Sequence, residues 1–274
     1  MTLYVTDLDG TLLRSDTTIS EYSETTLNRL MNEGVMFTYA TARSYASAAP
    51  LVKNLELRCP AVIFNGVFVV DPKTGQHLIE NVYTKECQQL ARDFFVRENI
   101  APLVYSYIDG KERVSYLESR FDDVANYVNA RKDDKRLRPV RNYDELFCGD
   151  IFYFTVIDPK NAELLDSVFT RENGFSRNVQ RDTYDDMIWY EIYDKSASKA
   201  NAVLQVKELV NADKLVCFGD NLNDISMIVT ADVGVAVENA CEELKELSDV
   251  TIGSNNDDGV ARYIDRQQQI CRGG

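Results

Sequence analysis

Histidine is almost missing from this chain of 274 residues, since His77 is the only one. Its scarcity argues against a metal site built from several histidines and against histidine-based acid–base catalysis. The six cysteines are scattered and form no Cys-x-x-Cys pair, which favours free thiols in a reducing compartment over a disulfide framework. The sequence also has no apolar run long enough to cross a bilayer and no basic segment leading into one. We therefore expect a cytoplasmic protein.

Basic residues are outnumbered as well. The chain has 30 Lys and Arg against 44 Asp and Glu, which gives a net charge of −14. Because nucleic acids and anionic membranes bind cationic surfaces, we expect neither as a partner. Apolar residues make up 45% of the chain, enough for a packed core, and the length suits one large or two modest domains. A phosphate ester would bind such an acidic protein where a cation and a few Lys or Arg side chains make the site locally positive.

The expected strands and helices divide the chain into three segments. Both ends alternate strands with helices, which predicts a parallel sheet covered on both faces. A helix there is expected from a turn at 41–44 to about Asn54, and the strands are expected at residues 3–6, 36–40, 61–64, 214–218, 232–237 and 250–252. The middle mixes helices and strands and is rich in Tyr and Phe. We expect an α/β fold with a Rossmann-like, doubly wound parallel-sheet core domain, residues 1–83 and 192–274, and an inserted α+β domain, residues 84–191.

Two carboxylates follow the first expected strand, in Asp7-Leu8-Asp9-Gly10-Thr11. Ligands of α/β proteins bind beyond the carboxyl ends of the strands, and extended residues two apart point the same way. Asp7 and Asp9 can therefore face one reaction centre, where a divalent cation would offset their repulsion. The alternative is an ordinary Asp-Gly turn with a capping aspartate.

A second acidic segment, Gly219-Asp220-Asn221-Leu222-Asn223-Asp224, follows the expected strand at 214–218. If this strand neighbours the first one, Asp220 lies beside Asp7 and Asp9 and completes a set of oxygen ligands suited to magnesium. Helix capping by Asp220 or Asn221 is the alternative, although it explains fewer of the polar residues.

Two further segments offer donors for a phosphate. Thr41-Ala42-Arg43 follows the second expected strand and supplies a hydroxyl, backbone N–H groups and a guanidinium. Lys199 lies near the start of an expected helix, just upstream of the second acidic segment. Each signal is weak alone, because Thr41 is also a good helix cap and most such lysines are solvated.

In this order the four segments resemble the haloacid dehalogenase superfamily of phosphotransferases. Asp7 to Thr11 matches its first motif, Thr41 its second, Lys199 its third and Gly219 to Asp224 its fourth. Three further segments resemble the Cof-type subfamily specifically: Asn65-Gly66, Ala236 to Ala240 and Asn256 to Val260. The inserted domain stands where that subfamily has its α/β cap. The chain departs from the usual Thr-Gly-Arg of the second motif in having Ala42, for which we expect tolerance.

The resemblance implies a Mg²⁺-dependent phosphatase that hydrolyses small phosphate monoesters such as sugar phosphates. It makes Asp7 the nucleophile that forms an aspartyl-phosphate, and Asp9 the general acid and base. It places the magnesium ion on Asp7, the backbone carbonyl of Asp9, and Asp220. The implied phosphate and substrate contacts are Thr41, Ala42, Arg43, Lys199 and Asn223, and the implied supporting residues are Thr11, Asn65 and Asp224.

Other functions stay open at this point. A phosphohexomutase-like phosphotransferase would return the phosphoryl group to a sugar hydroxyl, and a non-catalytic protein would only bind a ligand. We expect a small-molecule phosphate ester as partner and a monomer or weak homodimer. Candidates for selecting the leaving group, by residue type, are Tyr105, Tyr107, Arg113, Tyr184 and Trp189. For each of them, a place in the interior or on the surface of the inserted domain is the commoner explanation.

Overall fold

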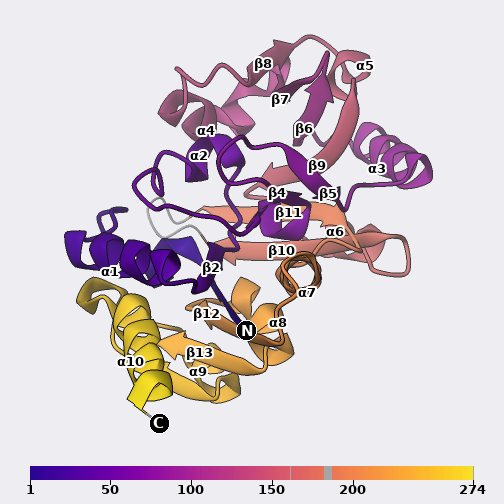
Figure 1. Ribbon diagram of the computed structural model, residues 1–274. Coiled ribbons are helices and arrows are strands. Elements are labelled where there is room, and N and C mark those ends of the chain that lie inside the picture. The colour runs from indigo at the N-terminus through magenta and orange to yellow at the C-terminus, as the bar shows by residue number, and fades with distance from the viewer. Residues whose placement is uncertain (161, 182–186, 274) are drawn as a thin grey trace. The chain divides into compact units, whose positions relative to one another are not determined.

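The computed structural model describes residues 1–160, 162–181 and 187–273 (Figure 1). The chain separates into two compact units, one formed by Met1–Glu80 with Ala197–Gly274 and the other by Asn81–Ser196. The first unit thus combines both ends of the chain, and the segment expected as an inserted domain, residues 84–191, lies inside the second unit. Among the described helices, none has the length and apolar character needed to span a membrane.

A five-stranded parallel sheet forms the centre of the first unit, in the order β14-β13-β12-β1-β2. Its members are short and mostly apolar, since a parallel strand is covered on both faces. They are β1 (Thr2–Thr6), β2 (Met36–Tyr39), β12 (Lys214–Gly219), β13 (Val233–Val237) and β14 (Val250–Ile252). Because β1 pairs with both β12 and β2, the strand that precedes Asp7 lies inside the sheet.

The helices of the first unit cover both faces of this sheet. From β12 the chain moves one way through α8 (Ile225–Thr230) and α9 (Glu242–Leu247), and from β1 it moves the other way through α1 (Glu21–Asn32). Such crossovers are right-handed, so the change of direction puts α1 on the face opposite α8 and α9. α10 (Gly259–Gly273) packs on α1, and α7 (Lys199–Leu209) packs on α8. The doubly wound fold is confirmed, and its change of direction, between β1 and β12, is where such sheets bind ligands.

Two expectations for residues 41–64 are corrected. The helix expected to reach Asn54 is a single turn, α2 (Tyr45–Ala48), because Pro50 has no N–H to donate to the helix. The strand expected near residue 61, β3 (Ala61–Ile63), touches the parallel sheet only through a bridge between Ala40 and Val62. It then forms an antiparallel sheet with β4 (Phe68–Val70) and β5 (His77–Glu80). The chain turns back there because Phe64 and Asn65 adopt positive φ angles of 50° and 53°.

The second unit is an α+β domain with a six-stranded sheet in the order β10-β11-β9-β6-β7-β8, antiparallel except for β7 with β8. Its strands are β6 (Leu103–Ile108), β7 (Lys111–Leu117), β8 (Leu137–Val140), β9 (Asp150–Ile157), β10 (Phe175–Arg181) and β11 (Ile188–Asp194). Its helices are α3 (Lys85–Arg97), α4 (Ala125–Ala130), α5 (Tyr143–Leu146) and α6 (Ala162–Val168). Side chains from α3 and α6 pack on β6, β9 and β11 in a core rich in phenylalanine.

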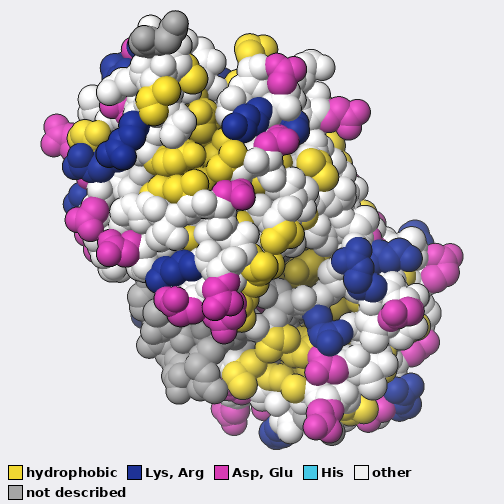
Figure 2. Space-filling view, turned by 90° about the horizontal axis from the view of Figure 1, so that it is seen from below, with side chains coloured by type: hydrophobic (Ala, Val, Ile, Leu, Met, Phe, Trp, Pro, Cys, Tyr) yellow, Lys and Arg dark blue, Asp and Glu magenta, His cyan; other side chains and the backbone are white. Residues whose placement is uncertain are grey.

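The acidic side chains of one face of the molecule are dispersed. Figure 2 shows Asp and Glu side chains spread over one face, with Lys and Arg side chains between them. Some of the acidic residues are paired, as where Arg29 contacts both Glu33 and Asp265. On this face the negative charge is therefore spread out and does not form a single patch.

The aromatic core of the second unit gives a direct test of its packing. Phe95 is fully buried, and its ring centre lies 5.2 Å from that of Phe169 and 5.4 Å from that of Phe154. We expect Phe95→Ala to lower the free energy of unfolding of this unit by about 3–5 kcal/mol, because it leaves a cavity. The neighbouring Val96 is exposed, so Val96→Ala should change it by about 0.5 kcal/mol or less. Urea unfolding followed by the fluorescence of the single tryptophan, Trp189 on β11, measures both, and equal effects would contradict the packing.

Candidate active site

The acidic segments meet because their strands are neighbours. Thr6 pairs with Phe218 across β1 and β12, and the Asp7 N–H donates to the Phe218 carbonyl over 2.9 Å. The two strands therefore end side by side, and Asp7 and Asp220 leave the same edge of the sheet. Thr41 follows β2 on the other side of β1, where the Ala40 N–H donates to the Thr6 carbonyl.

The chain after Asp7 forms a compact turn, Leu8–Leu12, which is called the Asp9 turn below. The Leu13 N–H closes it by donating to the Leu8 carbonyl over 2.8 Å. Gly10 has a φ of +70°, and a Cβ atom added there would lie 2.3 Å from an oxygen of Asp220. Only glycine fits this position, since both the backbone angle and the space exclude a side chain. Next to it, the Thr11 hydroxyl donates to Asp220 Oδ1 over 2.9 Å.

Lys199 joins the acidic residues through two buried ion pairs. Its Nζ lies 2.7 Å from Asp7 Oδ1 and 2.6 Å from Asp224 Oδ1, and all three side chains are at least nine-tenths buried. Ser198 caps α7 by accepting from the Asn201 N–H. The cap fixes the start of the helix, where Lys199 is the first residue. Gly66 allows this arrangement, because a Cβ atom there would meet the Ser198 carbonyl oxygen at 2.2 Å.

Burial and mutual repulsion shift the acidities of this cluster. Burial raises the pKa of Asp7 well above its usual range, Asp224 adds to the rise, and Lys199 opposes it. Burial and the nearby Asp224 raise the pKa of Asp220 to about 7. Burial alone would lower the pKa of Lys199, but Asp224 and Asp7 raise it. One lysine thus leaves the carboxylates short of positive charge, and a cation beside them would relieve their repulsion.

The donor set is suited to a divalent cation. One carboxylate oxygen from each of Asp7, Asp220 and Asp224 lies within 4.8 Å of the others. Asp224 is already engaged, since Oδ1 contacts Lys199 and Oδ2 accepts from the N–H groups of Asp220 and Asn221. Asp7 and Asp220 are therefore the better candidates for ligands, and oxygen ligands are what magnesium prefers.

Asp9 faces a different partner. Arg43 donates to both of its carboxylate oxygens, with Nε to Oδ2 at 2.7 Å and a terminal nitrogen to Oδ1 at 2.6 Å. The Asp9 side chain remains 45% exposed, in contrast to the buried Asp7. Asp9 is thus the more exposed of the two carboxylates, and Arg43 holds it in a two-point ion pair.

Hydrogen bonds within the loop and from the chain after β3 hold the loop that carries Arg43. The Thr41 hydroxyl accepts from the Arg43 N–H, and the N–H groups of Asn65 and Phe64 donate to the carbonyls of Thr41 and Arg43. Ala42, which replaces the usual glycine, is not among the residues with positive φ, so its methyl group brings no backbone strain. The departure at Ala42 is therefore compatible with this loop conformation.

The structure gathers most of the expected site residues at one edge of the sheet. Asp7, Thr11, Lys199, Asp220 and Asp224 form one connected network, and Asp9 with Arg43 forms a pair. The remaining ones lie in adjoining loops: Thr41, Ala42 and Asn65 near β2, and the half-buried Asn223 in the short turn Leu222–Asp224.

Sequence reasoning misses two residues that touch the Asp9 turn and the residue after it. Asn239 donates to the Gly10 carbonyl, and Asn255 donates to the Leu13 carbonyl. Asn239 lies in a segment for which only a resemblance, and no role, was predicted, and Asn255 directly precedes another such segment.

Comparison with known proteins decides the family. Residues 4–264 match the model of the haloacid dehalogenase-like hydrolases. The chain belongs to this family. Two phosphatases of Bacillus subtilis named for 5-amino-6-(5-phospho-D-ribitylamino)uracil, YitU and YwtE, are 26% and 27% identical to it, over 96% and 95% of this chain and 96% of each relative. A crystal structure of a haloacid dehalogenase-like hydrolase from Bacteroides thetaiotaomicron is 26% identical, with a TM-score of 0.75 over 97% of this chain and 98% of that one.

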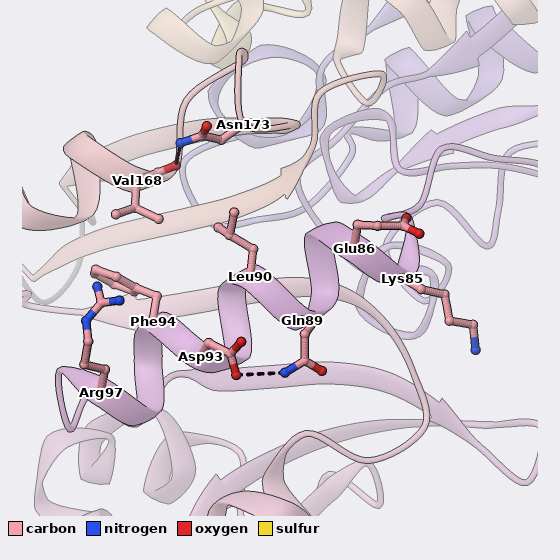
Figure 3. A pocket seen from close by; sticks show the side chains of 9 residues that line it. All are labelled: Lys85, Glu86, Gln89, Leu90, Asp93, Phe94, Arg97, Val168 and Asn173. Carbon is pink, nitrogen blue, oxygen red and sulfur yellow. Dashed lines mark hydrogen bonds between the residues drawn. The ribbon is translucent and has the colours of Figure 1, made fainter.

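Two hollows of this hydrolase lie in its second unit and are not candidates for the catalytic centre. The larger, about 780 Å³, runs along the outer face of α3 beside Val168 and Asn173 (Figure 3). It mixes Lys85, Glu86, Asp93 and Arg97 with apolar side chains, and Asp93 already accepts from Gln89 over 2.7 Å. The smaller, about 480 Å³, includes Arg120, Asp158 and Lys160. The buried acidic cluster with shifted pKa values lies in the first unit.

The residues proposed by type for leaving-group selection have structural partners of their own. The Tyr105 hydroxyl donates to that of Tyr127, and Arg113 donates to the Lys135 carbonyl. The ring of Trp189 lies 5.6 Å from that of Tyr127, and Tyr107 stands beside Phe152 at 5.4 Å. Tyr184 lies outside the described residues. Four of the five residues thus have contacts within the second unit.

The buried ion pairs of Lys199 can be tested through the stability of the hydrolase. We expect Lys199→Met to lower the free energy of unfolding by about 3 kcal/mol, because it leaves two buried carboxylates without their cation. Lys207→Met on the same helix breaks only a half-exposed pair with Asp232 and should cost about 1 kcal/mol or less. Urea unfolding followed by circular dichroism compares the two, and equal losses would argue against a buried ionic network.

Proposed function

We propose that this hydrolase is a Mg²⁺-dependent phosphatase that transfers the phosphoryl group of a small phosphate monoester to Asp7 and then to water. The observation that carries the proposal is the buried contact of Asp7 with Lys199 at the tips of β1 and β12. A carboxylate held there, beside a fixed ammonium group, is oriented for attack and has a positive charge next to the incoming phosphate. The names of the relatives support a phosphatase, and the family supports hydrolysis.

The first step forms a bond between a carboxylate oxygen of Asp7 and phosphorus and breaks the ester bond. Asp9 gives a proton to the departing alcohol oxygen, for which its half-exposed position is suited. The N–H groups and hydroxyl of the Thr41 loop, with Lys199, hold the remaining phosphoryl oxygens. A phosphate that takes over the donors of Arg43 releases Asp9 from its ion pair, and the freed carboxylate takes up from solvent the proton that it gives to the alcohol. Asn223 contacts the substrate from the neighbouring loop.

The second step returns the enzyme to its starting state. A water molecule attacks phosphorus, its proton goes to Asp9, and the bond to Asp7 breaks to release inorganic phosphate. Asp224 keeps Lys199 in place through both steps, and Thr11 and Asn65 support the loops on either side. The proton that Asp9 gave to the alcohol is thereby replaced.

Magnesium fits the donor set of Asp7 and Asp220, and we propose that the backbone carbonyl of Asp9 completes it. When bound, the ion supplies positive charge that offsets the repulsion between an anionic nucleophile and an anionic ester. Burial and the nearby Asp224 raise the pKa of Asp220 to about 7, and such an ion would relieve the repulsion between these carboxylates.

We further propose a substrate among sugar or polyol phosphates, because two relatives are named for a phosphorylated ribityl compound. One chain supplies every proposed catalytic residue, so a monomer or a weak homodimer suffices. All six cysteines lie within the described residues and are free thiols, which suits the cytoplasm.

Phosphate release from a panel of phosphorylated metabolites tests the proposal. We expect release with magnesium, none after EDTA, and a loss of at least about 1,000-fold in Asp7→Asn, because an amide cannot replace the carboxylate as the nucleophile. Asp213→Asn is the control, since this exposed carboxylate stands at the opposite, amino end of β12 and should leave the rate unchanged.

Two results would contradict the phosphatase. Activity that persists in a folded Asp7→Asn variant would remove the covalent mechanism. Conversion of a hexose 1-phosphate into its 6-phosphate, without release of phosphate, would show a mutase.

A further inference from the structure

The loops after β13 and β14 reach across the sheet edge and hold the chain that carries Asp9. The Asn239 side chain donates to the Gly10 carbonyl over 2.7 Å, and its own oxygen accepts from the Asn255 N–H over 3.0 Å. Asn255, which is buried, donates in turn to the Leu13 carbonyl over 2.9 Å. The two asparagines thus fix one carbonyl inside the Asp9 turn and another just after it.

The loop after β14 also contacts residues 14–23, which follow the Asp9 turn. Asp258, which is 8% exposed, accepts from the hydroxyls of Ser20 and Ser23 and from Arg14. Asn256 accepts from the Ser15 N–H and donates to its hydroxyl. Residues 10–23 are therefore anchored at several points by residues more than 200 positions away in the sequence.

Of these contacts, the hydrogen bond from Asn239 to the Gly10 carbonyl lies closest in the sequence to Asp9. Glycine permits more backbone angles than any other residue, so the peptide after Gly10 gains from contacts that fix it. Thr11 is fixed on one side by its bond to Asp220, and Asn239 fixes the preceding carbonyl on the other. These two contacts help to fix where the turn lies, and so where the side chain of Asp9, one residue before Gly10, leaves the backbone, while Arg43 holds its carboxylate.

We propose that Asn239, held by Asn255, is a positioning residue that aligns Asp9 for proton transfer to the leaving group. This role rests on the proposed phosphatase function. Asn239 itself is exposed, so its hydrogen bond contributes little to the stability of the fold. Its effect falls on the orientation of the acid, where a displacement of about 1 Å can cost up to about a hundredfold in rate.

The dependence on the leaving group distinguishes this role from a structural one. An alkyl phosphate needs a proton from Asp9 as the alcohol departs, whereas para-nitrophenyl phosphate has a leaving group that departs without one. The value of kcat/KM reports the first phosphoryl transfer for both. We expect Asn239→Ala to lower kcat/KM about tenfold or more for glycerol phosphate and about twofold or less for the aryl ester.

Two variants accompany this measurement. Asn239→Asp keeps an acceptor for the Asn255 N–H but loses the donor to Gly10, so it should show the same selective loss. Glu238→Ala replaces the exposed residue next to Asn239 and should leave kcat/KM unchanged for both substrates. Circular dichroism and urea unfolding show that each variant is folded.

The outcomes are distinct. A selective loss for the alkyl ester in both Asn239 variants supports the positioning role. Equal losses for the two esters, or no loss for either, overturn it and leave the phosphatase function intact. Activity on both esters that survives Asp7→Asn would remove the covalent mechanism of the proposed function, and with it the step that the positioning role serves.

Discussion

The buried contact of one lysine with two aspartates is the constraint on which the rest of this site depends. Lys199 lies within 2.7 Å of both Asp7 and Asp224, and all three side chains are buried. Removing charges from water is costly unless each has a partner, so the end of β1, the start of α7 and the loop after β12 must all lie at fixed places. The parallel sheet supplies that precision, since Thr6 and Phe218 are paired and their successors leave the same edge. The positive charge is still too small for the carboxylates around it, which is why the cluster is suited to a cation.

Close approaches of backbone and side chains extend this constraint into the loops. Gly10 stands against Asp220, and Gly66 stands against the carbonyl of Ser198, so neither position admits a side chain. The Asp9 turn is therefore fitted to the loop after β12, and the turn after β3 is fitted to the start of α7. The contacts of Asn239 and Asn255 with the chain after Asp9 belong to the same arrangement. A rigid sheet carries buried groups, while the half-exposed Asp9 stands on a turn that its neighbours hold in place.

The sequence predicts the sheet and the acidic residues because both follow from local patterns. Short apolar strands followed by Asp7 and Asp220 indicate a ligand-binding edge, and this pattern can be recognised without knowing the rest of the fold. The single turn of α2 was also predictable from Pro50, which ends the helix. The pairing of β3 was not, since it depends on positive φ angles at Phe64 and Asn65. Nor were the contacts of Arg43 with Asp9 and of Asn239 with Gly10, because each joins loops whose approach depends on the complete tertiary fold.

The central claim is that Asp7 carries the phosphoryl group during turnover, and chemical trapping tests it most directly. The enzyme would be quenched in acid during turnover of its best substrate, treated with borohydride, and digested for peptide mass analysis. Borohydride reduces an aspartyl-phosphate to homoserine and leaves a free carboxylate unchanged. The account predicts homoserine at position 7, dependent on substrate and magnesium. Homoserine at Asp9 or Asp220 instead, or unmodified Asp7 in an enzyme turning over a substrate under conditions where the intermediate accumulates, would contradict it.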